Sequence, residues 1–345
     1  MGHKINKPKY PKRGSRAFVP RVRAKRIYPK IKNWPKTKET KLLGFAAYKA
    51  GMTEITFVDN SANSLTKGEM ICVPVTILDA PKIKVAAIRF YKKDERRFKK
   101  VSTEIWTDKF DKELKRKISV PKKKLNFEEE IKKINIENSE DITVLVYTLP
   151  KGRANRKKPE IFEIAIGGEN INEKFEYAKS ILGNEISVSD VLKEGEQVDV
   201  IAVTKGKGFQ SPVKRNKIKL ESKKTDRTRR GVAAIGPDVP RKVSWTVPMP
   251  GQMGFHNRYD YNKWILKVGN EGLNFKKGLL NYGNVKEDYI ILKGSIPGSS
   301  KRLIRFRFAV NPNKGIPEKT PEKINIDGVK KWVKLFQFKG KQKKN

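Results

Sequence analysis

Cysteine and histidine are nearly absent from this chain, and their scarcity excludes several kinds of chemistry. Cys72 is the only cysteine among 345 residues, and the two histidines are His3 and His256. A single cysteine cannot form an internal disulfide, which gives weak support for a reducing setting inside the cell. A zinc site of Cys and His ligands cannot be assembled, and one cysteine and two histidines leave few ways to form a Cys/His catalytic pair. Because Cys72 lies in the apolar run MICVPVTIL, we expect it to pack in a core.

Long hydrophobic runs and common catalytic motifs are missing as well. No apolar run reaches the ~18 residues of a membrane-spanning helix, and we expect no signal peptide. The stretch GKGFQS at 206–211 lacks the spacing of a P-loop, and neither HExxH nor GxSxG occurs. The Gly206–Gly208 turn suits both a hinge and a close backbone approach to phosphate. We expect no enzyme activity, no small-molecule substrate and no cofactor, and a carboxylate-bound Mg²⁺ has no motif in this sequence.

Positive charge is what this chain has in excess. It carries 78 Lys plus Arg against 37 Asp plus Glu, a formal net charge of +41. Self-repulsion at this level opposes compaction, so a partner with many phosphates is the economical explanation. Nucleic acid is favoured over a lipid surface because no membrane segment is found. The 37% of apolar residues, with 16 Phe and 5 Trp, still supply a real core, and the length allows two domains.

The charge is distributed unevenly along the chain. Residues 1–41 contain fifteen Lys or Arg and one acid, whereas residues 91–200 contain 24 basic and 22 acidic residues. The near-neutral block therefore holds most of the acids. This pattern predicts a balanced domain that faces solvent or protein, and separate basic elements that face phosphate.

The stretch 205–258 combines dense positive charge with a lack of core character. Between Lys205 and Arg230 there are eleven Lys or Arg against two acids, with few apolar residues. Such a loop cannot bury enough apolar surface to offset an ordering cost of roughly 1–2 kcal/mol per residue. We therefore expect it to be held in shape by a polyanion.

The N-terminal segment has a proline every few residues, which forbids a long helix and favours an extended chain. Its aromatic residues Tyr10, Phe18, Tyr28 and Trp34 are interleaved with arginines. Two interpretations stay open. The segment is either a solvated tail with general affinity for acids, or an extension along folded RNA whose rings and Arg planes stack on bases. The last residues, GKQKKN, predict another basic tail.

Short apolar runs of strand length flank the balanced block. The expected strands are 42–48, 52–58, 70–78, 85–90, 142–150, 197–204, 264–268, 288–293 and 303–310, and the expected helices are 127–136 and 172–182. They predict one antiparallel barrel or sandwich interrupted by a more helical insertion. In the last strand, Arg305 and Arg307 alternate with Phe306 and Phe308. A period of two places the rings inward and both arginines on the outer face.

Several phrases together carry a family resemblance, in an order that spans most of the chain. They are RGSRAFVPRVRA (13–24), LLGFAAYKAGMT (42–53), VTKGKGFQSPVKR (203–215), RRGVAAIGPDVP (229–240), VPMPGQMGFHNR (247–258) and LNYGNVKEDYIILKGSIPGSSKRLIRFR (280–307). The chain resembles the universal large-subunit ribosomal protein L-three family, in its archaeal form. The block 91–200 matches the family least well.

The resemblance implies a mostly β fold with an α/β insertion, built on a six-stranded barrel of the translation-protein type with long basic extensions. The implied organisation is an extended basic tail at 1–41, a split barrel at 42–90 and 197–310, and an α/β insertion at 91–196. An RNA-penetrating loop or finger at 205–262 lies within the second barrel half, and a basic extension covers 311–345.

The resemblance also implies a function. Members of the family are structural constituents of the large ribosomal subunit in the cytoplasm. They bind and stabilise the large-subunit (23S-type) ribosomal RNA, support subunit assembly and contact neighbouring ribosomal proteins. Their finger reaches towards the peptidyl transferase centre, where RNA is the catalyst. At the finger tip this chain reads Gly236–Pro237–Asp238–Val239, where eukaryotic members have a tryptophan and bacterial members a glutamine. Asp226 stands where eukaryotic relatives have a methylated histidine, so tip-specific roles do not transfer.

Candidate RNA-binding residues are the basic side chains of both extensions and a few planar or polar ones beside them. The set is Arg13, Arg16, Arg21, Arg23, Arg26, Lys205, Lys207, Phe209, Gln210, Lys214, Arg215, Lys217, Lys219, Lys223, Lys224, Arg227, Arg229, Arg230, Arg241, Lys242, Trp245, Gln252, His256 and Arg258. Trp245 suits stacking on RNA and packing against Val243, Val247 and Met249 equally well. For His256 we expect a bond to RNA or to a neighbouring carbonyl, and for Gln252 a backbone or base contact.

Two other functions remain open at this point. An RNA-modifying enzyme would use the basic loop to hold its substrate, and it would need a cofactor pocket or an acid/base pair. An architectural DNA-binding protein would bind duplex DNA as tightly as structured RNA.

Overall fold

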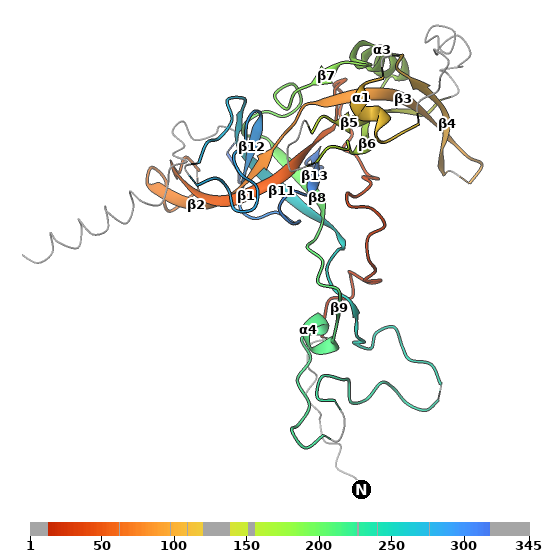
Figure 1. Cartoon of the computed structure of the whole chain (residues 1–345), viewed down its shortest axis with the longest axis vertical. Coiled ribbons are helices and arrows are strands. Elements are labelled where there is room, and N and C mark those ends of the chain that lie inside the picture. Colours follow the sequence, from red (N-terminus) through yellow and green to blue (C-terminus); the bar gives the residue numbers. More distant parts are fainter. Residues whose placement is uncertain are drawn as a thin grey trace, which may run out of the picture. The chain divides into compact units, whose positions relative to one another are not determined.

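The computed structural model describes residues 13–61, 63–96, 98–108, 110–119, 139–150, 156–225, 228–239, 241–275 and 277–317. The chain divides into two compact units (Figure 1). Met1–Arg26 and Val203–Asn257 form the first, which we call the basic unit. Ile27–Ala202 and Arg258–Asn345 form the second, which we call the β unit.

Six strands of the β unit close into a barrel. Their order is β1 (Gly44–Val58), β13 (Leu303–Phe308), β8 (Gln197–Val203), β11 (Asn257–Gly269), β12 (Tyr289–Lys293) and β2 (Met70–Asp79). Pairing is antiparallel, as between β1 and β13, where Phe45 lies opposite Phe306. The last residue of β8 and the first of β11 already belong to the basic unit, which is therefore an excursion between two neighbouring barrel strands.

A single long strand, β1, replaces the two strands expected at 42–48 and 52–58. Its register with β2 shifts between Lys49 and Gly51, so a bulge bends the strand without ending it. Lys49 is buried at the bulge, and its Nζ donates to the carbonyl of Ile296 at 2.8 Å. Burial lowers the pKa of this ammonium below its ordinary value.

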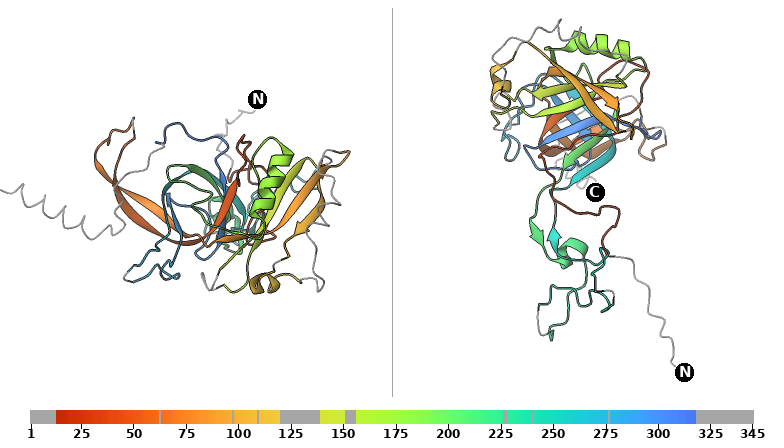
Figure 2. Two further views of the ribbon diagram at one scale, coloured as in Figure 1. Left: turned by 90° about the horizontal axis from the view of Figure 1, so that it is seen from above. Right: turned by 90° about the vertical axis from the view of Figure 1, so that its right-hand side faces the viewer.

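A second, five-stranded sheet forms the insertion. It contains β4 (Lys99–Trp106), β3 (Ile83–Lys93), β5 (Asp141–Thr148) and β6 (Ile161–Ala165) in that order, and β7 (Glu185–Ile186) pairs with β3. The strand expected at 85–90 is thus present as β3, but it pairs in this sheet and not in the barrel. The expected helix at 172–182 is α3 (Ile171–Ile181), which packs on this sheet (Figure 2).

The two sheets share one hydrophobic core. A single buried cluster contains Phe45 and Phe306 from the barrel together with Ile88 and Val144 from the second sheet. The short helix α1 (Lys112–Lys115) buries Leu114 in a smaller cluster. The β unit therefore forms one packed body. The expectation of a mostly β chain is confirmed, and its helices are few. The helix expected at 127–136 lies outside the described residues.

Cys72 is exposed, so its prediction as a core residue is wrong. β12 pairs with β2 only over Val75–Asp79, whereas β1 pairs with all of β2. Met70–Pro74 therefore belong to a two-stranded ribbon beyond the barrel, where alternate residues face solvent. The Cys72 thiol lies 3.7 Å from Glu54 Oε2. Desolvation, followed by the charge of Glu54, raises the pKa of Cys72.

Candidate nucleic-acid interface

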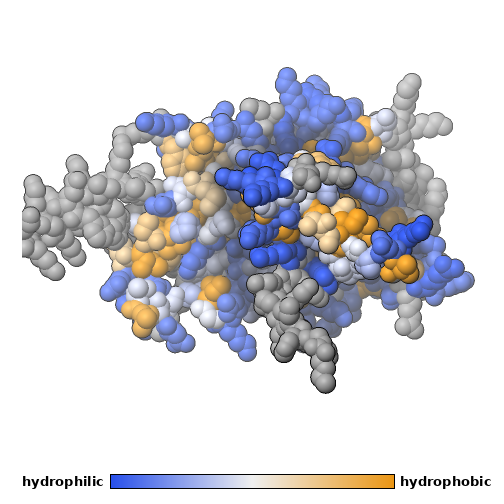
Figure 3. Space-filling view, turned by 90° about the horizontal axis from the view of Figure 1, so that it is seen from below, coloured by the Kyte–Doolittle hydropathy of each residue, from blue (hydrophilic) through white to orange (hydrophobic). Residues whose placement is uncertain are grey.

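The basic unit concentrates the charge of the chain. Its two segments contain 23 Lys or Arg and three acids, a net charge of +20, about half of the +41 of the whole chain. Figure 3 draws both units from below, with many hydrophilic side chains on this face and hydrophobic residues in separate patches. The unit has little apolar interior of its own, so polar contacts must hold it together.

The base of the basic unit is a narrow pair of strands. β9 (Phe209–Gln210) pairs with β10 (Gly251–Gln252), and Lys207 N donates to Met253 O at 2.9 Å. Gly254 has a φ of +72°, and a Cβ at this position would lie 2.1 Å from the carbonyl oxygen of Lys205. Only glycine allows the two chains to approach so closely.

Arg215 is the polar centre of this unit. It lies on the short helix α4 (Pro212–Asn216) and donates to four backbone carbonyls. They are Gln252 O from Nε at 3.1 Å, Met249 O at 2.9 Å, Pro250 O at 3.4 Å and Arg21 O at 3.3 Å. Burial, with a smaller contribution from the charge of Arg21, lowers the pKa of Arg215. Its donors are occupied by backbone, so we assign Arg215 a positioning role and not a phosphate contact.

The N-terminal segment runs beside the returning arm of the loop. Ala24 N donates to Phe255 O at 2.8 Å, and the guanidinium of Arg23 lies 5.2 Å from the ring centroid of Phe255. His256 is buried, and its Nδ1 lies 2.8 Å from Val22 O, to which it donates. Of the two partners expected for His256, the structure therefore shows the neighbouring carbonyl.

Two more predicted residues bind backbone in the same way. Gln252 Nε2 donates to Gly254 O at 3.0 Å, and the backbone carbonyl of Gln252 accepts from Arg215. Gln210 Nε2 donates to Lys207 O. These amides thus stiffen the narrow base of the unit.

Most other predicted residues of the interface are exposed. They are Arg13, Arg16, Arg23, Arg26, Lys205, Lys207, Phe209, Lys214, Lys217, Lys219, Lys223, Lys224, Arg229, Arg230, Arg241, Lys242 and Trp245. Arg21 and Arg258 are half-buried, and Arg227 lies outside the described residues, as does Asp226. The tip residues Gly236–Val239 are exposed. The unit therefore presents its cations to the surroundings while backbone contacts fix its base.

The N-terminal extension does not behave as one element. Tyr28 belongs to the β unit, where its Oη donates to Ile161 O at 2.6 Å and its ring meets Phe162 edge-on. Trp34 packs against the hydrophobic core of the β unit. The guanidinium carbon of Arg305 lies 5.9 Å from the centroid of the Trp34 ring. In one of the two interpretations of this segment, both rings stack on bases. The structure shows them on protein instead, whereas Phe18 in the basic unit is exposed.

Arg305 and Arg307 are buried, which corrects the expectation that they lie on an open outer face. Residues 27–34 cover them: Arg305 donates to Pro29 O at 3.0 Å and to the backbone carbonyl of Glu163, and Arg307 donates to Asn33 O. Burial lowers the pKa of Arg305 to about 10. The period of two correctly placed both arginines on one face of the strand. That face is covered by residues 27–34, which we call the strap.

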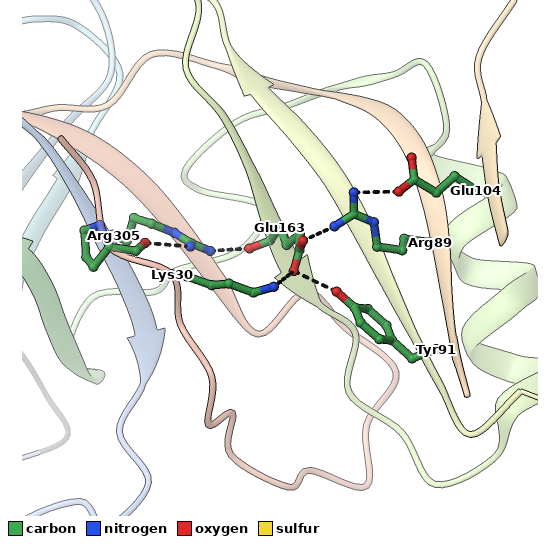
Figure 4. A network of polar contacts seen from close by, with 7 residues as sticks. Lys30, Arg89, Tyr91, Glu104, Glu163 and Arg305 are labelled. Carbon is green, nitrogen blue, oxygen red and sulfur yellow. Dashed lines mark hydrogen bonds and ion pairs between the residues drawn. The ribbon is translucent and has the colours of Figure 1, made fainter. Parts of the chain in front are cut away.

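Glu163 ties this strap to the second sheet (Figure 4). Its carboxylate accepts from Arg89 and from the Tyr91 hydroxyl at 2.9 Å, and it lies 3.5 Å from Lys30 Nζ. Lys30 from the strap, Arg305 from the barrel, and Arg89 and Tyr91 from the second sheet therefore all contact Glu163.

Tyr259 and Tyr261 were missed by the sequence argument. They lie on the same face of β11, stacked with ring centroids 6.1 Å apart, and both are exposed. The guanidinium of Arg307 lies 5.6 Å from the Tyr259 ring. Alternation of Tyr with polar residues in NRYDYN was the available signal. The pair offers a flat aromatic surface on the β unit.

Within the described part of the chain, no three His, Cys, Asp or Glu residues gather in a way that could hold a metal ion. Among the same residues no helix is long and apolar enough to cross a membrane.

Comparison with known proteins gives a consistent result. The family model described as Ribosomal protein L3 matches residues 1–335. The "Large ribosomal subunit protein uL3" of Methanocaldococcus jannaschii is 46% identical over 339 residues, covering 97% of this chain and all of that protein. The proteins of the same description from Methanopyrus kandleri and Methanobrevibacter smithii are each 47% identical, over 329 and 312 residues. They cover 92% and 88% of this chain, and 90% and 92% of their own lengths.

Proposed function

Because this chain belongs to the ribosomal protein L3 family, we propose that it stabilises large-subunit ribosomal RNA through its basic unit and so supports subunit assembly. The chain is a structural constituent of the large ribosomal subunit and not an enzyme. The concentration of 23 cations against three acids in the basic unit carries the proposal.

The contacts within the basic unit explain why it presents these cations effectively. Arg215, His256 and Gln252 use their polar atoms on backbone carbonyls and thereby fix the base of the unit. The exposed lysines and arginines then extend from a partly ordered framework. Less conformational entropy is lost when such a framework binds than when a free tail does.

The resemblance suggests finer assignments, which we include in the proposal. The barrel is of the translation-protein type, and residues 205–262 act as a finger that enters RNA. The exposed tip at Gly236–Val239 approaches the peptidyl transferase centre. Neighbouring large-subunit proteins contact the β unit. RNA-bound Mg²⁺ accompanies the finger without a dedicated protein site.

Matched charge variants test the RNA-binding proposal. Lys223→Ala/Lys224→Ala removes two exposed lysines from the basic unit, and Lys115→Ala/Lys117→Ala removes two exposed lysines from the β unit. Affinity of the full chain for large-subunit RNA is measured at several salt concentrations. The slope of log K against log salt is negative. The first pair should reduce its magnitude by about 1.4–1.8, because each phosphate neutralised contributes about 0.7–0.9. The second pair should leave the slope unchanged.

Other outcomes would contradict the proposal. Equal effects of both pairs would mean that charge alone, and not the basic unit, attracts RNA. Equal affinity of the wild-type chain for duplex DNA would favour an architectural DNA-binding protein. In cell extract, the protein should remain with the large-subunit peak of a sucrose gradient after a high-salt wash, since salt removes proteins held only by surface charge. Recovery in the soluble fractions would argue for a transient factor.

A further inference from the structure

A small cleft lies wholly within the basic unit. It has a volume of about 90 Å³ and is bordered by the N-terminal segment, the end of α4 and the returning arm of the loop. Its lining includes four arginines, Arg13, Arg16, Arg21 and Arg215, together with Trp245. No acid lines it. The space holds several water molecules, which is room for a phosphate or a sugar edge and not for a duplex.

Two of the arginines form a fixed floor. Arg21 donates to Asn216 Oδ1 at 3.1 Å and to Ser15 O at 2.8 Å, and Arg215 donates to the carbonyls already described. Gly14 makes this possible, since its φ is +78° and a Cβ there would lie 2.9 Å from the Arg21 guanidinium. The floor therefore brings two cations together, and no described acid lies beside them in the lining.

The other two arginines are free to meet a ligand. Arg13 and Arg16 are exposed and have no carboxylate partner within the part of the chain that the structure describes. The Arg16 guanidinium lies over the Trp245 ring, 5.7 Å from its centroid. Trp245 keeps 67% of its surface exposed, so a second planar group can stack on the indole.

These features fit one class of ligand. Guanidinium groups form paired hydrogen bonds with phosphate, and exposed indole and guanidinium planes stack on unpaired bases. An acidic peptide would satisfy the charge but would leave the indole without a planar partner. We propose that this cleft binds a single unstacked RNA nucleotide, with its base on Trp245 and its phosphate on Arg13 and Arg16. The proposal rests on the proposed function and adds a discrete site to it.

Fluorine NMR of the full chain labelled with 5-fluorotryptophan can observe this site directly. Trp245→Phe assigns the Trp245 resonance, and the buried Trp264 serves as an internal reference. The probes are an adenosine octaribonucleotide and an abasic octamer with the same phosphates. We expect the adenosine octamer to shift the Trp245 resonance and the abasic octamer to leave it near its original position.

Variants then separate stacking from charge. Trp245→Ala should lower affinity for the adenosine octamer about 5- to 150-fold, the range found for base–aromatic stacking. Phe98→Ala is the matched control, because Phe98 is 68% exposed but lies in the β unit. Arg16→Ala should raise the dissociation constant seen at the Trp245 resonance about 10-fold through a lost charge-assisted bond. Arg241→Ala removes the same charge from an exposed position outside the cleft and should have a smaller effect.

The outcomes distinguish this inference from the proposed function. If both octamers bind but shift Trp245 equally, or not at all, the cleft is refuted while general RNA binding stands. A larger shift with a short polyglutamate peptide would also overturn it, in favour of a protein partner. If neither octamer binds at low salt, the proposed function fails, and the cleft proposal fails with it.

Discussion

The buried pair of Arg307 and Asp199 makes the sharpest prediction about stability. The two side chains are only 5% and 1% exposed, and the guanidinium contacts Asp199 Oδ2 at 2.9 and 3.0 Å. Replacing Arg307 by methionine keeps most of the volume and removes the cation. The carboxylate of Asp199 then stays buried, and the backbone N–H of Asn262 is its remaining described hydrogen-bond donor. Leaving one charge of a buried pair uncompensated should lower the free energy of unfolding of the β unit by about 3–5 kcal/mol.

Denaturant unfolding of the full chain, followed by circular dichroism, measures this loss. Arg96→Met is the control, since Arg96 is exposed in the same unit and its replacement should change stability by less than about 0.5 kcal/mol. Asp199→Asn added to Arg307→Met should restore part of the stability, because no buried charge remains. A loss below about 1 kcal/mol for Arg307→Met, or further destabilisation in the double variant, would refute the reasoning.

Three further predictions concern other parts of the chain. Replacing Lys207–Gln252 by a short Gly-Ser linker should leave the unfolding midpoint of the β unit unchanged and abolish incorporation into large subunits; unfolding of that unit would show that the division is wrong. Gly254→Ala should speed hydrogen exchange at the base of the basic unit, because its Cβ would meet Lys205 O at 2.1 Å. Gly208→Ala, with a φ of +69° but no atom within 4 Å, should do so much less. Burial raises the pKa of Glu160 above 4.5, so its contribution to stability is full below pH 4.5 and is lost as pH rises through the raised value. Glu160→Gln should remove this part of the pH dependence, measured as denaturant midpoints from pH 4 to 7.

The strands were predictable from the sequence because each buries an apolar run of strand length. Their partners were less so. β3 is an apolar run like the barrel strands, but it pairs with β5 and β4. Which sheet β3 joins depends on residues far along the chain. The continuity of β1 was missed because Lys49 and Gly51 read as a break, whereas a bulge accommodates them. Local propensity fixes whether a segment is a strand, and long-range packing decides to which sheet it belongs.

The candidate interface was predictable as a region but not residue by residue. Charge density identified the segments that form the basic unit, because that density is a property of composition. It could not show that Tyr28 and Trp34 pack on the β unit, since nothing local distinguishes them from Phe18. The cleft at Trp245 joins residues more than two hundred positions apart, so only the fold brings them together.

The arginines of this chain divide into two classes that composition cannot separate. Arg215 and Arg305 direct their donors at backbone carbonyls of the same chain, and Arg307 directs its donors at a backbone carbonyl and the Asp199 carboxylate. Arg13 and Arg16, by contrast, face outward. The same planar fork of donors suits a carbonyl cluster and a phosphate, so the surroundings decide the role. Substitution should therefore give opposite signatures. Loss of an inward arginine lowers the free energy of unfolding at every salt concentration, while loss of an outward one leaves folding intact and weakens RNA binding most at low salt.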